Sequence, residues 1–378
     1  MNYMFEDFNS LTNLVTHPEH FMISPMVSRI TRFNNDPLSL IHHNNENYII
    51  PIGVRGHPDG WCGQIHNFNM FKLLNEQYIK DLREGRAILL LDNSHEEYHP
   101  KWLFNFFHDS HEMMKLPAEC LVYLTGNAIV ERLYEEWCEE RSVSNKIKCL
   151  TFAIFEEEIF CNHQKVYTPS ILDHLEYKNK NYTWSFNCLQ KRPRGHREQF
   201  FDLLCDNDLV TKGLCSYPDR DVWIHGEVHD DSNYGSYVSR LHPEYCLQTF
   251  VTVVSEPQYF SFENSVFNSE KVFKPIACNH PFIVLGGKGS LASLKKRGYR
   301  TFRNYFDESY DDIDDDEERM HAIIDVLKHI ESIEDKNAWF ESMRGVLTFN
   351  YDTFVKNSLK PDNAMVAVEE YYGGYFNE

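Results

Sequence analysis

The chain has 378 residues, of which 42% are hydrophobic, and its formal net charge is −20. This length favours about two domains with sizeable cores, and the hydrophobic content excludes a globally disordered chain. The negative charge disfavours general binding of nucleic acid, because neutralising phosphates requires clustered Lys and Arg.

The cysteines and the N-terminal segment bear on the compartment. The ten cysteines are scattered without a C-x-x-C pair, which favours free thiols in a reducing compartment over disulfides or zinc ligands. The opening segment MNYMFEDFNSLTNLVTHPEH is acidic and has no apolar core of a signal peptide. No run approaches the roughly 18 apolar residues of a membrane span. We therefore expect a cytoplasmic protein without a membrane span.

The first half alternates short apolar runs with helical patterns. The expected strands are NYIIPIGV (47–54), RAILLLDN (86–93), ECLVYLTGN (119–127) and KIKCLTFAIF (146–155). The expected helices cover residues 68–85, 100–116 and 128–143. Continuous apolar strands that alternate with helices indicate a parallel sheet with both faces covered.

After an irregular zone at about 157–182, the alternation begins again. The expected strands are 184–189, 246–256 and 281–287, and the expected helices are 196–208, 269–279, 290–298, 316–333 and 337–359. The predicted fold class is α/β, with two Rossmann-like doubly wound domains that face each other. We expect the domains to be residues 1–178 and 179–345, followed by a helix and tail at 346–378. Such sheets bind ligands beyond the carboxyl ends of their strands, so the predicted site is the cleft between the halves.

A basic loop follows the expected strand 184–189. It contains Arg192, Arg194, His196 and Arg197 and opens a helix. Guanidinium groups together with backbone N–H groups at a helix N-terminus form an anion site, and a pyrophosphate is the anion that we expect. The alternative is a solvated basic loop.

Two further groups follow the next expected strand. Glu256 comes directly after the strand and can accept hydrogen bonds from sugar hydroxyls, or it can serve as a capping residue. Ser269 is expected to cap a helix that begins near Glu270. Lys271 then lies in the first turn, where the helix dipole disfavours a cation, and Lys274 lies one turn further on. This placement favours a bound anion.

The sequence F-E-N-S, which includes Asn264, precedes S-E-K at Ser269, Glu270 and Lys271. This pair of motifs resembles the donor-binding signature of α1,3-fucosyltransferases. The wider pattern VVSE…SEKVFKPIACNHPFIVLGG…RGYRTF, with PIGVRGH, LLLDNSHEE and YLTGN before it, is similar to fucosyltransferase-like glycosyltransferases of bacteriophages and large DNA viruses. The resemblance covers roughly residues 50 to 345. The Tyr and the acidic residue expected between the two motifs are missing, so the sugar stays open.

The resemblance implies a glycosyltransferase of the GT-B architecture, with a nucleotide-diphosphate sugar as donor and no obligatory metal or other cofactor. Residues 1–178 would form the acceptor side and 179–345 the donor side, and 346–378 would pack back toward the N-terminal domain. Glu270 would hold the ribose, and Lys271 and the Arg192–Arg197 loop the diphosphate. In a viral protein the compartment would be the host cytoplasm.

The acceptor side should supply the general base. The expected strand 86–93 ends with Asp92, and His95, Glu96 and Glu97 follow it. An inverting transfer needs a carboxylate near the acceptor hydroxyl, so Glu96 or Glu97 is the predicted base. The alternative is an acidic cluster that stabilises the next helix. Arg55 and His57, after the first strand, are further acceptor-side candidates.

The predicted function is therefore transfer of a sugar from a nucleotide-diphosphate sugar to a hydroxyl acceptor, with a saccharide favoured as acceptor. One alternative is a DNA glycosyltransferase that modifies a hydroxymethylated base in viral DNA, although the charge disfavours nucleic acid. Another is an inactive nucleotide- or sugar-binding module. The acidic run DDIDDDEE (311–318) favours a solvated loop at a helix N-terminus over a metal site.

Overall fold

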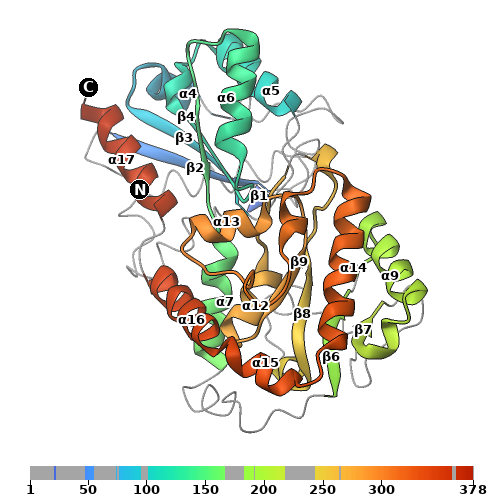
Figure 1. The fold of residues 1–378 in the computed structure, drawn as a ribbon. Coiled ribbons are helices and arrows are strands. Elements are labelled where there is room, and N and C mark those ends of the chain that lie inside the picture. Colours follow the sequence, from blue (N-terminus) through green and yellow to red (C-terminus); the bar gives the residue numbers. More distant parts are fainter. Residues whose placement is uncertain are drawn as a thin grey trace. The chain divides into compact units, whose positions relative to one another are not determined.

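The structure is a computed structural model that describes residues 21–22, 47–54, 74, 76–94, 101–166, 183–190, 192–217, 243–263, 265–359 and 363–377. The chain divides into two compact units (Figure 1). The first comprises Met1–Ile154 and Pro361–Glu378, and the second comprises Phe155–Lys360. Both units are α/β, and each contains a sheet with four parallel strands.

The sheet of the first unit has the strand order β1-β2-β3-β4-β5. Its strands are β1 (Phe21–Met22), β2 (Tyr48–Val54), β3 (Ala87–Asn93), β4 (Leu121–Thr125) and β5 (Lys148–Thr151). Strands β2 to β5 are parallel, and β1 pairs antiparallel with β2. The described strands follow one another in chain order, so the strand order does not reverse among them. The doubly wound arrangement that we expected in this half is therefore not found in its described strands.

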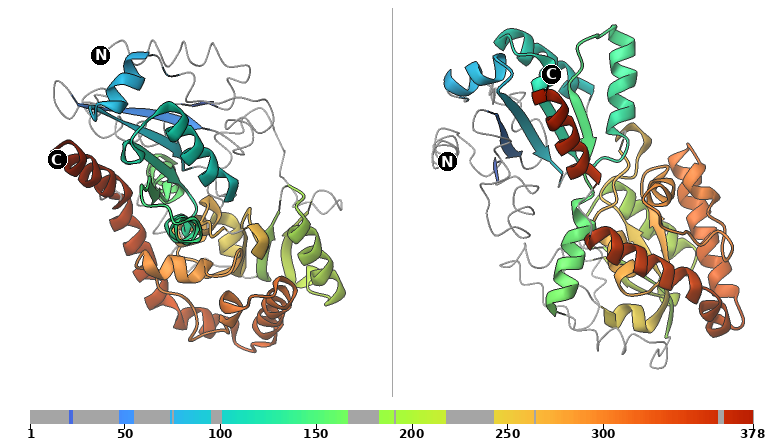
Figure 2. Two further views of the ribbon diagram at one scale, coloured as in Figure 1. Left: turned by 90° about the horizontal axis from the view of Figure 1, so that it is seen from above. Right: turned by 90° about the vertical axis from the view of Figure 1, so that its left-hand side faces the viewer.

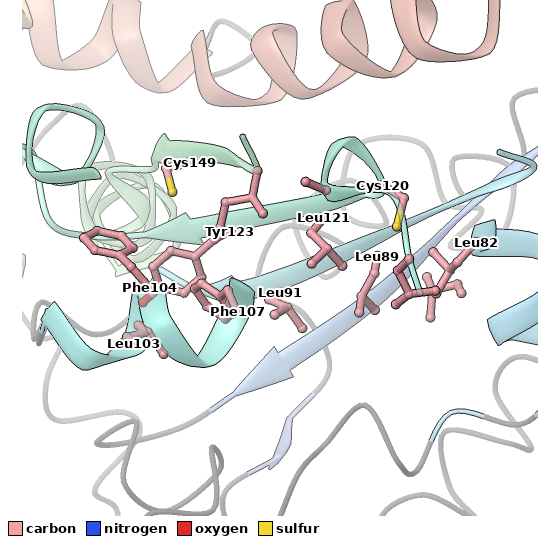
Figure 3. Close-up of a cluster of buried hydrophobic side chains, with 14 of the residues drawn as sticks. Leu82, Leu89, Leu91, Leu103, Phe104, Phe107, Cys120, Leu121, Tyr123 and Cys149 are labelled. Atoms are coloured by element: carbon pink, nitrogen blue, oxygen red, sulfur yellow. The ribbon is translucent and has the colours of Figure 1, made fainter. Parts of the chain in front are cut away.

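Helices of the first unit pack onto this sheet. They are α4 (Glu76–Arg83), α5 (Lys101–Met114), α6 (Val130–Arg141), the short η3 (Ala118–Cys120) and α17 (Asn363–Asn377). Parallel strands in chain order with right-handed crossovers place the connecting helices on one face. Figure 3 shows Leu103, Phe104 and Phe107 of α5 against sheet side chains such as Leu91 and Tyr123. Helix α17 packs against β5 (Figure 2). Tyr371 Oη of this helix donates to Glu119 O at 2.6 Å.

The sheet of the second unit has the order β7-β6-β8-β9, and all of its strand pairs are parallel. Its strands are β6 (Trp184–Leu189), β7 (Gly213–Ser216), β8 (Thr249–Ser255) and β9 (Phe282–Leu285). The chain moves from β6 to β7 in one direction and from β8 to β9 in the other. The strand order therefore reverses between β6 and β8, which is where doubly wound sheets bind ligands.

Because the strand order reverses, the helices of the second unit lie on both faces of its sheet. They are α7 (Ile154–Val166), α9 (Gly195–Asp206), η5 (Val210–Lys212), α11 (Pro243–Gln248), η8 (Ser261–Glu263), α12 (Glu270–Ala277), α13 (Ser290–Lys296), η9 (Ser309–Asp312), α14 (Asp316–Ser332), α15 (Lys336–Ser342) and α16 (Arg344–Leu359). Right-handed crossovers in opposite directions place α9 and α12 on opposite faces of the sheet. Helix α14 packs with α9 on one face, and α16 packs with α12 on the other (Figure 1).

The unit boundaries differ from the expected 178/179 and 345/346. Glu156, on α7, is buried and accepts hydrogen bonds from Arg297, Tyr299 and Asn357, the last at 2.9 Å. A buried carboxylate requires such partners, so α7 belongs to the second unit from its first turn. The expected single helix at 337–359 is two helices, α15 and α16, and both stay in the second unit. Only α17 groups with the first.

One close approach in the second sheet gives a direct test of its packing. Gly213 begins β7, and a Cβ at this position would lie 2.5 Å from two ring atoms of the fully buried Phe186. We expect Gly213→Ala to destabilise the protein by about 1–3 kcal/mol, because neither ring nor strand has room to move. At Gly345, in α16, a Cβ would meet no other atom within 4 Å. Gly345→Ala is therefore the control and should be neutral or stabilising in urea unfolding. Equal stabilities of the two variants would contradict the packing.

Candidate functional site

The candidate site lies at the carboxyl ends of β6 and β8, where the strand order of the second sheet reverses. The loop after β6 leads into α9, and the segment after β8 leads through η8 to α12. Every donor-site residue that we predicted and that the structure describes lies on one of these two connections. The fold therefore brings the two predicted motifs to the same edge of one sheet.

Arg197 and His196 join the two connections rather than face an open space. The buried Arg197 donates to Ser255 Oγ at 3.1 Å, to Ser255 O at 3.0 Å and to Arg192 O at 3.2 Å. Burial lowers the pKa of Arg197 to about 10, and burial likewise lowers the pKa of His196 to about 3. The neutral His196 imidazole donates from Nε2 to Glu256 O at 3.1 Å. Both side chains thus fix the start of α9 to the end of β8.

Arg192 and Arg194 are the exposed cations of the same loop. Arg194 donates from Nη1 to Pro257 O at 2.7 Å, which holds its guanidinium beside the segment after β8. The predicted basic loop therefore divides into two parts. His196 and Arg197 are buried and bind backbone oxygens, whereas Arg192 and Arg194 are exposed, although Arg194 also donates to a backbone oxygen.

Glu256 connects β8 to the start of α12. Its carboxylate is buried and accepts hydrogen bonds from Ser269 N at 3.1 Å and from Ser269 Oγ. Burial raises the pKa of Glu256 to about 7, although the charge of Lys271 and the bonds from Ser269 oppose this rise. The alternative that we left open, a capping role for Glu256, describes this geometry.

The start of α12 is built as the sequence predicts. The helix begins at Glu270, and Ser269 Oγ accepts a hydrogen bond from Lys271 N at 3.3 Å. Lys271 Nζ lies 2.8 Å from Glu270 Oε1 and 3.1 Å from Ser269 Oγ. Burial disfavours the Glu270 carboxylate, but the ammonium groups of Lys271 and Lys274 outweigh this effect and lower its pKa. The adjacent carboxylate thus offsets the unfavourable position of Lys271 at the helix N-terminus.

A cavity of about 130 Å³ lies between the sheet and α12. Its lining comprises Asn187 and Leu189 of β6, residues 252–255 of β8, Tyr245 and Cys246 of α11, and Lys271, Lys274, Pro275 and Cys278 of the α12 region. Among the described residues, no carboxylate lines it. Burial lowers the pKa of Lys274 to about 8, so its amine is still mostly protonated at neutral pH. Two ammonium groups on one wall make this cavity suited to a small anionic group.

Of this lining, sequence reasoning predicted only Lys271 and Lys274, and Asn187, Tyr245 and Cys246 are among the residues that it missed. Asn187 interrupts the apolar strand β6, and its amide donates to Thr249 Oγ1 at 2.8 Å and to Thr252 Oγ1 at 2.9 Å. A polar residue inside a buried strand was the available signal. Tyr245 gave no such signal. Cys246 was expected to begin a strand at 246–256, which was wrong for its first three residues, because helix α11 continues to Gln248 and β8 begins at Thr249.

In the first unit, Asp92 is the one predicted catalytic residue that the structure describes. It is buried at the end of β3, and its Oδ1 accepts a hydrogen bond from Ser94 N at 3.1 Å. This contact stabilises the turn that leaves the strand. The other predicted residues of this half, Arg55, His57, His95, Glu96 and Glu97, lie outside the described residues, as does Asn264 of the donor motif.

The acidic run at 311–318 caps helices. Asp311 accepts hydrogen bonds from Leu291 N at 2.9 Å and from Ala292 N at 3.0 Å, at the start of α13. Asp315 caps α14 by accepting from Glu318 N at 2.8 Å. Within the described part of the chain, no group of three or more His, Cys, Asp or Glu side chains could hold a metal ion.

Comparisons with known proteins give no further information about the site. No protein-family model, no curated protein and no solved structure matches the chain. Across the described ranges, no helix is both long enough and apolar enough to cross a membrane.

The pKa of Glu256 predicts a pH-dependent contribution to stability. The folded carboxyl keeps its proton up to about pH 7, whereas the unfolded one loses it near the ordinary value of 4.5. Its contribution is therefore complete below about pH 4.5 and is lost as the pH rises through 7, and it is on the order of 3 kcal/mol. In Glu256→Gln this dependence should be absent, while the amide oxygen still accepts from Ser269 N.

The measurement is the free energy of unfolding in urea at about pH 5 and about pH 8 for wild type and variant. Glu334→Gln, at an exposed position of the same unit, is the matched control and should follow wild type. Parallel pH profiles of wild type and Glu256→Gln would show that the Glu256 carboxyl does not titrate in this window.

Proposed function

We propose that the protein is a glycosyltransferase that moves a sugar from a nucleotide-diphosphate sugar to a hydroxyl acceptor, preferably a saccharide. The observation that carries this proposal is the cavity beside the strand-order reversal, with Lys271 and Lys274 on its wall. Its location agrees with the general position of nucleotide sites in doubly wound sheets. The resemblance to fucosyltransferase-like enzymes supplies the reaction class, and the GT-B arrangement of the two units is part of the same proposal.

The two lysines have complementary parts in this function. The Lys271 ammonium is held by Glu270 Oε1 and Ser269 Oγ, so it has a fixed position before a ligand arrives. Lys274 has no hydrogen bond or ion pair with another described residue and faces the cavity. A diphosphate leaving group develops negative charge as the glycosidic bond breaks. Pre-placed cations stabilise that charge without reorganisation, and they do so without a metal ion.

The acceptor side and the base belong to the proposal in the form that the sequence predicts. Glu96 or Glu97 would remove the proton of the acceptor hydroxyl. A viral DNA base remains the alternative acceptor. No described feature of the second unit favours DNA, since the described residues of the two connections include few exposed cations, among them Arg192, Arg194 and the partly exposed Lys271.

One observation supports a second candidate, a catalytically inactive binding module. Arg197 is committed to backbone carbonyls and Lys271 is paired with Glu270, so part of the positive charge is balanced within the protein. In such a module the cavity would hold a smaller anion or none. Calorimetric titration with nucleoside diphosphates tests the transferase, which requires nucleotide binding. A module that binds nucleotide is separated from it by a sugar-transfer or donor-hydrolysis assay, in which the module shows no turnover.

The first test of the donor site removes the amine in the cavity. A charge-assisted contact contributes about 1.5–3 kcal/mol, so Lys274→Met should weaken binding of the preferred nucleoside diphosphate about tenfold or more. Lys271→Gln combined with Glu270→Gln removes the neighbouring charge pair together and avoids an unpaired buried carboxylate. The matched control is Lys296→Met, at an exposed position of α13. Affinity that is unchanged in folded Lys274→Met would remove Lys274 from the site.

Chemical labelling locates the same site independently. With its pKa at about 8, Lys274 should react with an amine-selective reagent at neutral pH faster than the exposed Lys296. A bound nucleoside diphosphate should protect Lys274 and leave Lys296 unprotected, as read by mass spectrometry. Equal protection of both amines would indicate a general effect of the nucleotide rather than occupation of the cavity.

The test of the acceptor side uses the predicted base. Loss of a general base lowers turnover by on the order of 10²–10⁴, so Glu96→Gln or Glu97→Gln should show this loss with donor affinity unchanged. The measurement pairs calorimetry of the nucleotide with a sugar-transfer or donor-hydrolysis assay. A loss of donor affinity in both variants would place these carboxylates in the donor site instead. Tight, salt-sensitive binding of duplex DNA in a gel shift would favour the DNA acceptor.

A further inference from the structure

A stacked pair of aromatic rings, of which Phe260 is half-buried and Phe262 exposed, lies on the connection that leaves β8. Phe262, in η8, is 76% exposed, which is unusual for a large apolar side chain in a well-packed unit. Its ring stacks on that of Phe260, with ring centroids 5.4 Å apart and an angle of 11° between the ring planes. We call these two rings the aromatic platform. Single exposed apolar residues are common, so the platform requires a second observation.

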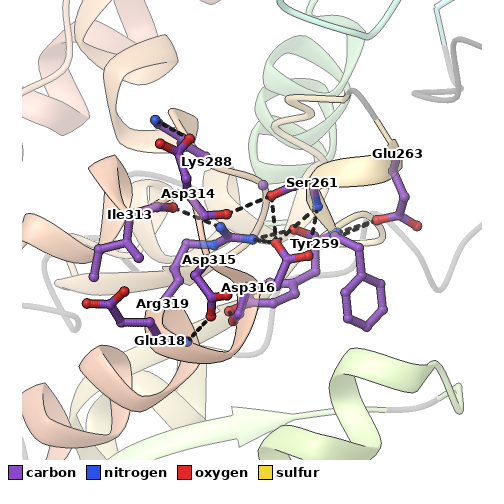
Figure 4. A network of polar contacts seen from close by, with 12 residues as sticks. Tyr259, Ser261, Glu263, Lys288, Ile313, Asp314, Asp315, Asp316, Glu318 and Arg319 are labelled. Atoms are coloured by element: carbon purple, nitrogen blue, oxygen red, sulfur yellow. Dashed lines mark hydrogen bonds and ion pairs between the residues drawn. The ribbon is translucent and has the colours of Figure 1, made fainter.

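That observation is the rigidity of the turn that carries Phe262. Glu263 Oε2 accepts hydrogen bonds from Tyr259 N and Phe260 N, both at 2.8 Å. Asp316 accepts from Ser261 N at 3.0 Å and from Ser261 Oγ at 2.7 Å (Figure 4). The carboxylates of Glu263 and Asp316 therefore hold the backbone of the turn at residues 259–261, directly before Phe262.

The buried Arg319 holds the Asp316 carboxylate in place. Arg319 donates to Asp316 Oδ1 and to Tyr259 O, each at 2.6 Å, and its guanidinium lies 4.4 Å from the centre of the Tyr259 ring. Its other amino group donates to Ile313 O at 3.0 Å. Figure 4 shows these contacts converging on the turn. These hydrogen bonds fix the backbone that carries Phe262 before any ligand binds. Such pre-organisation is typical of a surface that binds a ligand.

A short series of contacts joins the aromatic platform to the candidate site. The Phe260 ring packs edge-to-face on His196 at 5.9 Å, and His196 donates to the main-chain oxygen of Glu256. The Glu256 carboxylate in turn holds Ser269 at the start of α12. The exposed Arg194 is next to Gly195, where a Cβ would lie 3.6 Å from the Phe260 ring. The rings and Arg194 thus follow the carboxyl ends of β8 and β6, and the last residues of the same two strands, Ser255 and Leu189, line the cavity.

We propose that the aromatic platform stacks the nucleobase of the nucleotide donor, with Phe262 as the contacting ring. This inference rests on the proposed function and adds to it a positioning residue. A nucleobase fits because it has a flat π-face and continues the stack of Phe260 and Phe262. The phosphates of the same ligand would extend toward the cations of Arg194 and the cavity.

The test compares a nucleotide with its phosphate part. Nucleoside diphosphates and inorganic pyrophosphate are titrated calorimetrically into wild type, Phe262→Ala and Phe262→Tyr. Phe262→Ala should weaken the preferred nucleoside diphosphate roughly five- to one-hundredfold and leave pyrophosphate affinity unchanged, whereas Phe262→Tyr keeps the ring and the affinity. Leu359→Ala, which removes a 63% exposed side chain from α16, is the matched control.

The outcomes separate this inference from the proposed function. If wild type binds the nucleotide and Phe262→Ala binds it with the same affinity, the proposed role of the aromatic platform is overturned and the proposed donor site stands. Equal losses for nucleotide and pyrophosphate would mean that the turn, rather than the ring, supports the site, and also overturn it. Absence of nucleotide binding by wild type overturns both proposals. A concentration-dependent dimer in sedimentation that Phe262→Ala abolishes, with nucleotide affinity unchanged, would assign the ring to self-association instead.

Discussion

The second unit depends on one buried carboxylate, that of Glu256, at the point where the strand order reverses. A buried carboxylate is tolerated only with hydrogen-bond partners, and Ser269 supplies both its backbone N–H and its hydroxyl. The main-chain oxygens of Ser255 and Glu256 accept from Arg197 and His196 at the start of α9. Two consecutive residues at the end of β8 therefore fix the starts of two helices on opposite faces of the sheet. Every residue of the candidate site is positioned relative to this junction.

Contacts within the protein explain how a cavity lined by two lysines coexists with a net charge of −20. Much of the acid near the site is engaged by backbone: Asp311 and Asp315 cap helices, and Asp316 binds the turn at Ser261. These carboxylates stabilise N–H groups that would otherwise lack partners. The described lining of the cavity contains two lysines and no carboxylate. The charged groups that line the cavity therefore differ in sign from the average composition.

Local features of this fold could be read from the sequence, and features set by distant contacts could not. The cap at Ser269 and the start of α12 depend on neighbouring residues alone, and both were predicted correctly. Strand existence follows from apolar runs, but the strand order in the first sheet depends on crossover direction, which the runs do not encode. The position of α7 was missed because Glu156 finds its partners about 140 residues later, at Arg297 and Tyr299. The basic loop likewise gave no indication that Arg197 would be buried against β8.

The rigidity of the candidate site bears on the free-energy cost of binding a ligand. Lys271, Arg194 and Phe262 each lie on a backbone segment that hydrogen bonds hold in place before any ligand is present. A ligand that binds such a surface loses its own freedom but does not have to order loops of the protein, so more of its contact energy appears as affinity. Lys274 is the exception, since its amine has no fixed partner among the described residues and can adjust to the anion that enters the cavity. A fixed frame with one adjustable cation suits a leaving group whose charge increases during the reaction.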